Sequence, residues 1–205
     1  MTGAAEALAR LREGNRRFVA NTMQAAASSA PARRAALVEE QAPFAVILGC
    51  SDSRVPAELV FDQGFGDLFV IRVAGNIVAP SQIGSVEFAA SRFGTKLVVV
   101  LGHTHCGAVM ATLEELLGEA RNESRNLRSI VDRVRPSVES LISIRRVGNT
   151  DALMHEAVRA NVRASVNRLK HGSELLERLV EKAGLRIVGA EYSLETGVVE
   201  FFDEV

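Results

Sequence analysis

Two unbroken apolar runs, each broken at a glycine, constrain the fold of this chain more than any other feature. The first lies within Ala45–Arg54, AVILGCSDSR, and the second within Leu97–Ala108, LVVVLGHTHCGA. Uninterrupted runs of Val, Ile and Leu are typical of strands buried on both faces of a parallel sheet. The sequence therefore predicts an α/β fold in which both segments are strands of a mostly parallel central sheet.

Residues that can bind a metal follow directly after both runs. Cys50 and Asp52 come after the first glycine, and His103 and Cys106 come after the second. In an open α/β sheet, ligands collect outside the carboxyl ends of the strands. Two thiolates, an imidazole and a carboxylate form a four-coordinate set suited to zinc. A single cysteine would be explained as a small buried residue, but the second one, three residues after a histidine, favours a metal site.

Composition limits the class of protein. With 205 residues, 47% of them hydrophobic, the chain can form one substantial core, and we expect one domain. The 24 basic and 25 acidic residues give a net charge of −1, which favours neither a nucleic-acid nor a membrane partner. The N-terminal segment lacks the apolar core of a signal peptide. Without a secretion signal, Cys50 and Cys106 favour metal binding in a reducing cytoplasm over a disulfide.

The first 40 residues predict a helical arm. Ala4, Leu8 and Leu11 recur at helical spacing and form a narrow apolar stripe. Asn21–Pro31 is rich in Ala and Ser and is predicted to be a connector, and Arg33–Glu40 a short helix. The apolar stripe alone favours packing of the first helix on its own domain.

Helices and strands alternate through the rest of the chain. Ser81 is a candidate N-cap for a helix over Gln82–Phe93. Pro136 is predicted to divide Arg121–Arg146 into two helical pieces. Further helices are expected over Val55–Phe61, Gln82–Phe93, Ala108–Leu117 and Ser173–Ala183. A long helix is expected after Asn149–Asp151, with a buried stripe formed by Val158, Val162, Val166 and Leu169. Further strands are expected over Leu68–Val73, Leu185–Tyr192 and Val198–Phe202, the last returning as an antiparallel edge strand.

The two metal-binding segments resemble the motifs of the β-class carbonic anhydrases. The matching residues are Cys50-Ser51-Asp52-Ser53-Arg54 and Gly102-His103-Thr104-His105-Cys106-Gly107, in the order and at the separation that the family shows. The resemblance covers nearly the whole chain. It implies a single domain over 1–205, with an N-terminal helical arm over 1–40 and an α/β core flanked by helices over 41–205. It also implies one zinc ion per chain and a homodimer or homotetramer, in which the first helix reaches across to a second subunit.

Asp52 and Arg54 suggest how such a zinc site opens. With Asp52 on the metal the coordination is full, whereas the planar guanidinium of Arg54 can hold that carboxylate at two points instead. The freed position can then take a water whose pKa zinc brings from about 15.7 toward the neutral range. The resemblance implies that the resulting hydroxide attacks CO₂ to give bicarbonate, with Asp52 and Arg54 as the catalytic pair.

The family's substrate pocket is carried over only where residues match. The resemblance implies substrate contacts for Gln41, nine positions before Cys50, for Phe69 and Phe88 as aromatic walls, and for Gly107 after the last ligand. Both phenylalanines would also be ordinary core residues in an α/β domain. A mostly apolar pocket suits CO₂, a small molecule without a net dipole.

Other positions help to define the site. His103, directly after Gly102, matches the family's ligand, whereas His105 is expected to face the pocket wall or a neighbour. His155 and His171 are expected to be surface or packing residues. Members regulated by bicarbonate have a Trp where this chain has Ile47, so we expect no such regulation, although Arg72 and Tyr192 stand near the other contacts of that regulatory site.

Two alternatives to carbonic anhydrase activity remain open from the sequence. The same scaffold hydrolyses CS₂ or COS in a few relatives, where access to the pocket decides the substrate. In the other alternative the chain is a non-catalytic structural zinc protein, in which Asp52 is a permanent fourth ligand. Arg54 favours an enzyme, because a structural site needs no partner for its carboxylate.

Overall fold

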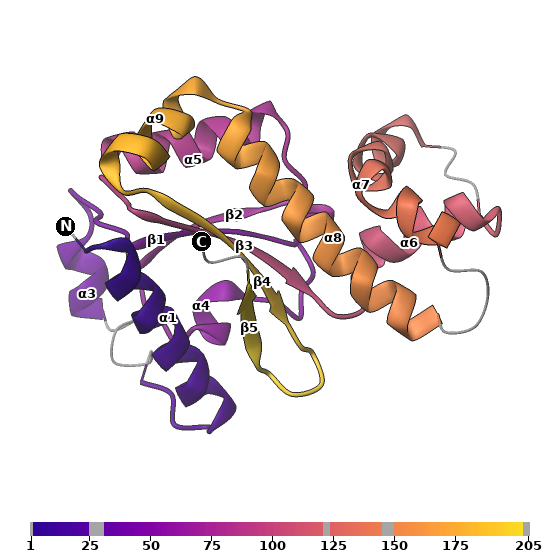
Figure 1. Ribbon diagram of the computed structural model, residues 1–205. Coiled ribbons are helices and arrows are strands. Elements are labelled where there is room, and N and C mark those ends of the chain that lie inside the picture. The colour runs from indigo at the N-terminus through magenta and orange to yellow at the C-terminus, as the bar shows by residue number, and fades with distance from the viewer. Residues whose placement is uncertain (1, 25–30, 121–123, 145–149, 203–205) are drawn as a thin grey trace.

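A computed structural model describes residues 2–24, 31–120, 124–144 and 150–202, and a five-stranded sheet forms its centre (Figure 1). The strands are β1 (Ala45–Gly49), β2 (Leu68–Arg72), β3 (Leu97–His103), β4 (Arg186–Tyr192) and β5 (Val199–Phe202). Their order is β2-β1-β3-β4-β5. The first four strands are parallel and β5 is antiparallel to β4. The predicted mostly parallel sheet with an antiparallel edge strand is confirmed.

The two apolar runs form the neighbouring strands β1 and β3. Every residue of both strands is buried, as expected for strands with helices on both faces. Their parallel register places Gly49 beside Leu101. Because the two strands run side by side in one direction, the residues that follow them meet at the same edge of the sheet.

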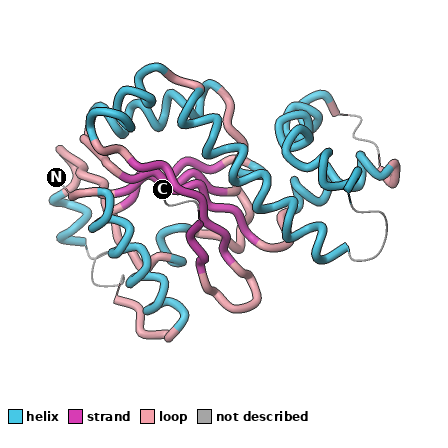
Figure 2. The backbone as a smooth tube through the Cα atoms, in the orientation of Figure 1, coloured by secondary structure: helices cyan, strands magenta, loops and turns pink. Residues whose placement is uncertain are grey.

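Helices cover both faces of the sheet, as Figure 2 shows. One face packs against α1 (Ala4–Val19) and α4 (Ala57–Val60), and the other against α5 (Pro80–Arg92), α8 (Thr150–His171) and α9 (Glu174–Ala183). A third apolar cluster joins α8 to α6 (Gly107–Leu117) and α7 (Arg125–Ile144). The remaining elements are α3 (Pro31–Ala36) and the 3-10 turn η1 (Ala74–Asn76). None of the helices described is long and apolar enough to cross a bilayer.

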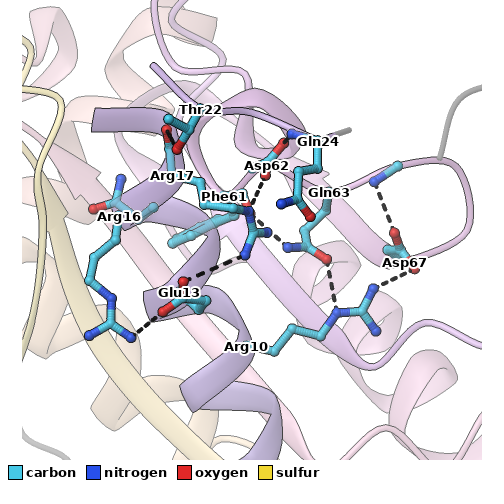
Figure 3. A network of polar contacts seen from close by, with 12 residues as sticks. Arg10, Glu13, Arg16, Arg17, Thr22, Gln24, Phe61, Asp62, Gln63 and Asp67 are labelled. Atoms are coloured by element: carbon cyan, nitrogen blue, oxygen red, sulfur yellow. Dashed lines mark hydrogen bonds and ion pairs between the residues drawn. The ribbon is translucent and has the colours of Figure 1, made fainter. Parts of the chain in front are cut away.

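Helix α1 packs on its own domain. Ala7, Leu8 and Leu11 join the apolar cluster on the α1 side of the sheet. Figure 3 shows polar contacts between the same helix and the segment after α4. One of them is the ion pair between Arg10 Nη2 and Asp67 Oδ1 at 2.9 Å. Within this chain, α1 is therefore part of the core that supports β1 and β3.

A buried asparagine fixes where α1 sits. Asn15 donates to the carbonyl groups of Val60 and Gly197 at 3.1 and 2.9 Å, and its Oδ1 accepts from the Val199 N–H at 2.9 Å. A Cβ on the preceding Gly14 would lie only 1.8 Å from the Phe61 carbonyl oxygen. Neither Gly14 nor Asn15 is marked by a local sequence pattern, because the partners of both residues are distant along the chain.

Three predicted boundaries need correction. Ser81 is not an N-cap, because α5 begins at Pro80, whose missing N–H costs little in a first turn. Pro136 does not interrupt α7, because Val134 and Val138 are fully buried on either side of it and their packing outweighs one lost backbone hydrogen bond. The first short helix spans Pro31–Ala36 rather than 33–40. Most of the predicted connector at 21–31, both ends of the segment 121–146 and the start of the segment 149–151 lie outside the described residues.

Candidate metal centre

Three of the four predicted zinc ligands lie together at the carboxyl ends of β1 and β3. Cys50 follows β1, His103 is the last residue of β3, and Cys106 precedes α6 as its N-cap. Their candidate ligand atoms, two sulfurs and an imidazole nitrogen, all lie within 4.8 Å of one another, and all three residues are buried. The side-by-side pairing of β1 and β3 brings the two turns together.

The hydrogen bonding of His103 leaves one ring nitrogen available. Its Nδ1 lies 2.8 Å from the Thr104 carbonyl oxygen, and because a carbonyl can only accept, Nδ1 carries the proton. Nε2 then has a free lone pair. It is buried and has no hydrogen-bond partner in the described part of the chain. A buried acceptor without a partner is costly unless a cation binds it, so this nitrogen fits a metal ligand.

The two thiols interact directly in the same cluster. A side-chain hydrogen bond with Cys106 lowers the pKa of Cys50 to about 4, and the Gly75 N–H, 3.3 Å from Cys50 Sγ, acts in the same direction. The hydrogen bond with Cys50, together with burial, raises the pKa of Cys106. Both cysteines are free rather than joined in a disulfide. Two sulfurs and one histidine nitrogen are a donor set that fits zinc.

Asp52 lies beside this cluster, but Arg54 binds it. Arg54 Nε donates to Asp52 Oδ1 at 2.9 Å and Nη2 donates to Oδ2 at 2.7 Å, a two-point contact. These hydrogen bonds from Arg54 hold the pKa of the Asp52 carboxyl well below its usual range. Asp52 Oδ2 is still only 3.8 Å from His103 Nε2. The structure thus shows the carboxylate next to the candidate metal position and paired with Arg54.

Arg72 supports the turn that carries Cys50 and Asp52. Its Nε donates to the Cys50 carbonyl at 2.9 Å and its Nη2 to the Asp52 carbonyl at 2.5 Å. From the sequence, Arg72 was expected only near a bicarbonate-regulation site, and this contact was not predicted. A basic residue at the end of the strand adjacent to β1 was the only signal for it.

The other two residues considered for regulation are buried in the core. Ile47 lies at the centre of β1 and is completely buried. Tyr192 is buried at the end of β4, where it pairs in register with His103, and its ring lies 6.4 Å from that of Phe18. Both side chains belong to the apolar cluster on the α1 side of the sheet.

The remaining histidines have carboxylate partners. His105 Nε2 lies 2.7 Å from Glu195 Oε1, and Thr104 Oγ1 donates to the same carboxylate at 2.9 Å. His155 lies 3.2 Å from Glu191 and His171 lies 3.4 Å from Glu177. The geometry thus separates His103, which faces the cysteines, from His105, which holds the loop between β4 and β5.

The predicted substrate residues do not gather at the cluster within one chain. Gly107 begins α6 next to Cys106. Gln41 precedes β1 and Phe69 pairs with Val46 near its start, so both lie toward the amino ends of the strands. Phe88 is half exposed on α5, and the centre of its ring lies 6.2 Å from that of Phe69, with the two rings tilted. At about 3.3 Å per residue, β1 alone separates its first and last residues by about 13 Å.

The sheet and the donor set define an α/β protein with a candidate metal centre of the cysteine and histidine type. A family model described as carbonic anhydrase matches residues 45–199. A carbonic anhydrase of Mycolicibacterium smegmatis is 41% identical over 190 residues, which cover 93% of this chain and 89% of that protein. Carbonic anhydrase 2 of Mycobacterium tuberculosis is 39% identical over 197 residues, covering 95% and 91%.

A solved structure agrees with these relatives. One of two tetrameric β-carbonic anhydrases from the filamentous ascomycete Sordaria macrospora superposes with a TM-score of 0.73 at 22% identity, covering 84% of this chain and 87% of that one. The chain therefore belongs to the carbonic anhydrase family, in its β class, and is an enzyme of that kind. The resemblance drawn from the two motifs is confirmed.

Proposed function

We propose that this chain catalyses the reversible hydration of CO₂ to bicarbonate and a proton, with one zinc ion per chain held by Cys50, His103 and Cys106. The observation that carries the proposal is the pairing of Asp52 with Arg54 beside three converging donors. Because zinc prefers four ligands, three protein donors leave one position for the reaction. A permanent structural site would instead use Asp52 as the fourth ligand, so this geometry speaks against the non-catalytic alternative.

Asp52 and Arg54 orient the reacting water. When bound, zinc supplies a Lewis acid that brings the pKa of a water molecule toward the neutral range. Asp52, kept ionised by Arg54, can only accept hydrogen bonds. It therefore accepts one from the attacking oxygen and turns that oxygen's lone pair toward the carbon of CO₂. A C–O bond forms, one electron pair of a C=O bond moves onto its oxygen, and a proton leaves to solvent.

Rapid CO₂ hydration is the direct test. Stopped-flow measurements on protein whose zinc content has been counted should show turnover that rises from about pH 6.5 to 9, since the nucleophile is the deprotonated form of water. A rate that stays flat over this range would contradict the hydroxide step. Absence of turnover in zinc-loaded protein would overturn the proposal and make CS₂ and COS the next substrates to assay.

A homodimer or homotetramer is part of this proposal. The Sordaria macrospora relatives are described as tetrameric. Here the edge strand β2 carries half-buried apolar side chains, Leu68, Phe69 and Val70, and Phe88 nearby is 53% exposed. An exposed apolar sheet edge favours pairing with another copy. A second copy would also bring the Gln41, Phe69 and Phe88 end of one sheet to the metal centre of another, and sedimentation analysis would measure the assembly.

The other features of the proposed enzyme follow from the same residues. We propose a single domain over 1–205 and a cytoplasmic location, which suits two free metal-binding thiols. We also propose a site without bicarbonate regulation, because Ile47 cannot supply the side-chain N–H of a tryptophan. A strongly sigmoidal dependence of activity on pH, with cooperative inhibition by bicarbonate, would overturn the last of these.

A further inference from the structure

Two buried polar side chains on α8 hold the turn η1. Asn161 Nδ2 donates to the Gly75 carbonyl at 2.8 Å, and Ser165 Oγ donates to the Asn76 carbonyl at 3.0 Å. The two donors are four residues apart and so lie on one helix face. Only 2% of Asn161 and 4% of Ser165 is exposed, so water cannot replace either bond if the side chain is removed. Neither residue was identified in the sequence, where the apolar stripe beside them was the dominant signal.

The turn that Asn161 holds is in direct contact with the metal centre. The Gly75 N–H points at Cys50 Sγ at 3.3 Å. Gly75 has a φ of +69°, which favours glycine, and a Cβ there would lie 3.0 Å from that of Ala108. The next residue, Asn76, also has a positive φ, of 43°. A turn with two left-handed residues needs external support to keep one orientation, and α8 supplies it.

We propose that Asn161 is a positioning residue for Cys50, acting through the backbone of Gly75. Asn161 fixes the peptide that follows Gly75 and thereby the direction of the Gly75 N–H. That N–H, by donating to the sulfur, withdraws electron density from it and limits how strongly Cys50 donates to a metal. The inference rests on the proposed function, in which Cys50 is a zinc ligand, and it assigns the tuning of that ligand to a side chain 111 positions away in the sequence (161 − 50).

Cobalt substitution of the full-length protein tests this assignment. Co²⁺ takes the place of zinc, and its thiolate-to-metal charge-transfer band reports the electron density on sulfur. Asn161→Leu keeps a similar side-chain size but removes the donor. We expect the band of this variant to move to lower energy, because the sulfur regains electron density. Its Co²⁺ affinity should fall about 10-fold, because the turn that orients the Gly75 N–H toward Cys50 is no longer held.

Ser165→Ala is the matched control, because it removes a similarly buried bond from the same helix to the next carbonyl along the turn. Its band should stay within error of the wild type. Equal band shifts in both variants, or a folded Asn161→Leu protein with wild-type spectrum and affinity, would overturn the inference alone. A wild-type protein that binds no Co²⁺ would overturn the proposed function and the inference with it.

A measurement on the unmodified sequence covers the case in which Asn161→Leu does not fold. In wild-type protein loaded with ¹¹³Cd, an N–H···S bond to a metal-bound cysteine transmits a scalar coupling from the metal to the amide proton. The Gly75 amide should show this coupling. A Gly75 amide without it would mean that the N–H does not donate to the ligand, and the inference would fail.

Discussion

The two ends of the sheet differ in how complete they are within one chain. At the carboxyl end, Cys50, His103 and Cys106 converge in a buried cluster, with Asp52 paired to Arg54 beside it. At the amino end, three of the four predicted substrate residues, Gln41, Phe69 and Phe88, lie by a half-exposed aromatic edge, where the rings of Phe69, Phe88 and Phe93 meet at tilted and edge-to-face angles. No metal cluster of His, Cys, Asp or Glu was found near them among the described residues.

This difference separates two tasks. A metal centre needs donors placed to a fraction of an ångström, and neighbouring parallel strands of one chain provide that. A pocket for a small apolar substrate needs walls that exclude water, and a second copy of the chain can provide those. We therefore expect the metal ligands at the carboxyl end to come from one chain, whereas the residues at the amino end contribute to a site only when a second copy of the chain is present.

The largest effect is expected from removing a ligand at the carboxyl end. Cys106→Ser should lose zinc and nearly all CO₂ hydration, because a serine hydroxyl does not supply the thiolate that zinc prefers. The loss of activity should exceed the roughly 100-fold that follows from losing a mere partner of a ligand. Zinc counting by atomic absorption and stopped-flow assay check it, with Thr112→Ala, buried on α6, as a folding control. A variant that kept one zinc per chain would show that Cys106 is not a ligand.

The next effect concerns the pair beside the cluster. Asp52→Asn should keep zinc but lose activity by about 10² to 10⁴, because the amide cannot remain an acceptor at both oxygens of the contact with Arg54. In the wild type, Arg54 lowers the pKa of Asp52, so the carboxylate stays ionised above its ordinary pKa of 3.8 and is protonated only at more acidic pH. Activity should therefore show no loss from Asp52 across the neutral range. If Asp52→Asn instead mainly lowered zinc affinity and stability, Asp52 would be a permanent ligand, as in the structural alternative.

A smaller effect tests the amino end. Gln41→Ala should lower kcat/KM about 10-fold, the effect of one hydrogen bond worth about 1.4 kcal/mol. When the Gln41→Ala and Cys106→Ser variants are co-expressed, they should form hetero-oligomers. In these, the intact metal centre of the Gln41→Ala chain meets the intact Gln41 of the Cys106→Ser chain at one site. In a symmetric dimer such a site restores about half of the wild-type activity. Hetero-oligomers no more active than the average of the two parent variants would show that Gln41 does not act across an interface.

The smallest effect concerns a carboxylate on β4, next to the strand of the metal centre. Burial raises the pKa of Glu191 above its ordinary value of 4.5, and Glu191 Oε1 has no hydrogen-bond partner in the described part of the chain. A folded state that holds its proton more tightly than the unfolded chain loses stability as pH rises from 4.5 through that raised pKa. Glu191→Gln should remove this loss of stability with rising pH. The free energy of unfolding at neutral pH should then increase by on the order of 1 kcal/mol.

Urea unfolding at several pH values would measure that gain. Arg159 keeps the two-point contact with Glu200 at 3.0 and 3.1 Å, so the substitution does not leave its charge unpaired. Glu200→Gln on β5 is the control, because the Glu200 side chain is exposed and Arg159 lowers its pKa, so its own effect on stability lies below its ordinary pKa of 4.5. A Glu191→Gln protein whose stability depended on pH as steeply as that of the wild type would show that the buried charge costs nothing.

The sequence by itself determined the inner strands and pointed to the candidate metal-binding residues that follow them. Both signals are local: a run of Val, Ile and Leu has only one good solution in an α/β domain, and the residues after its glycine must lie at a strand end. The family resemblance rested on those same two segments. The buried helix positions Val158, Val162 and Val166 were predicted for the same reason, because periodicity is a local property.

Only the tertiary structure decided how those residues are used. Whether Asp52 faces the cluster or Arg54 is a choice between two short-range options that the sequence leaves equal. The free Nε2 of His103 and the support of Gly75 by Asn161 depend on partners set by the fold. Helix α7 runs through Pro136 because buried neighbours outweigh a local rule. Contacts between distant segments carry energies that no local pattern encodes, and so the positions of Asn15, Arg72 and Asn161 emerged only once the chain had folded.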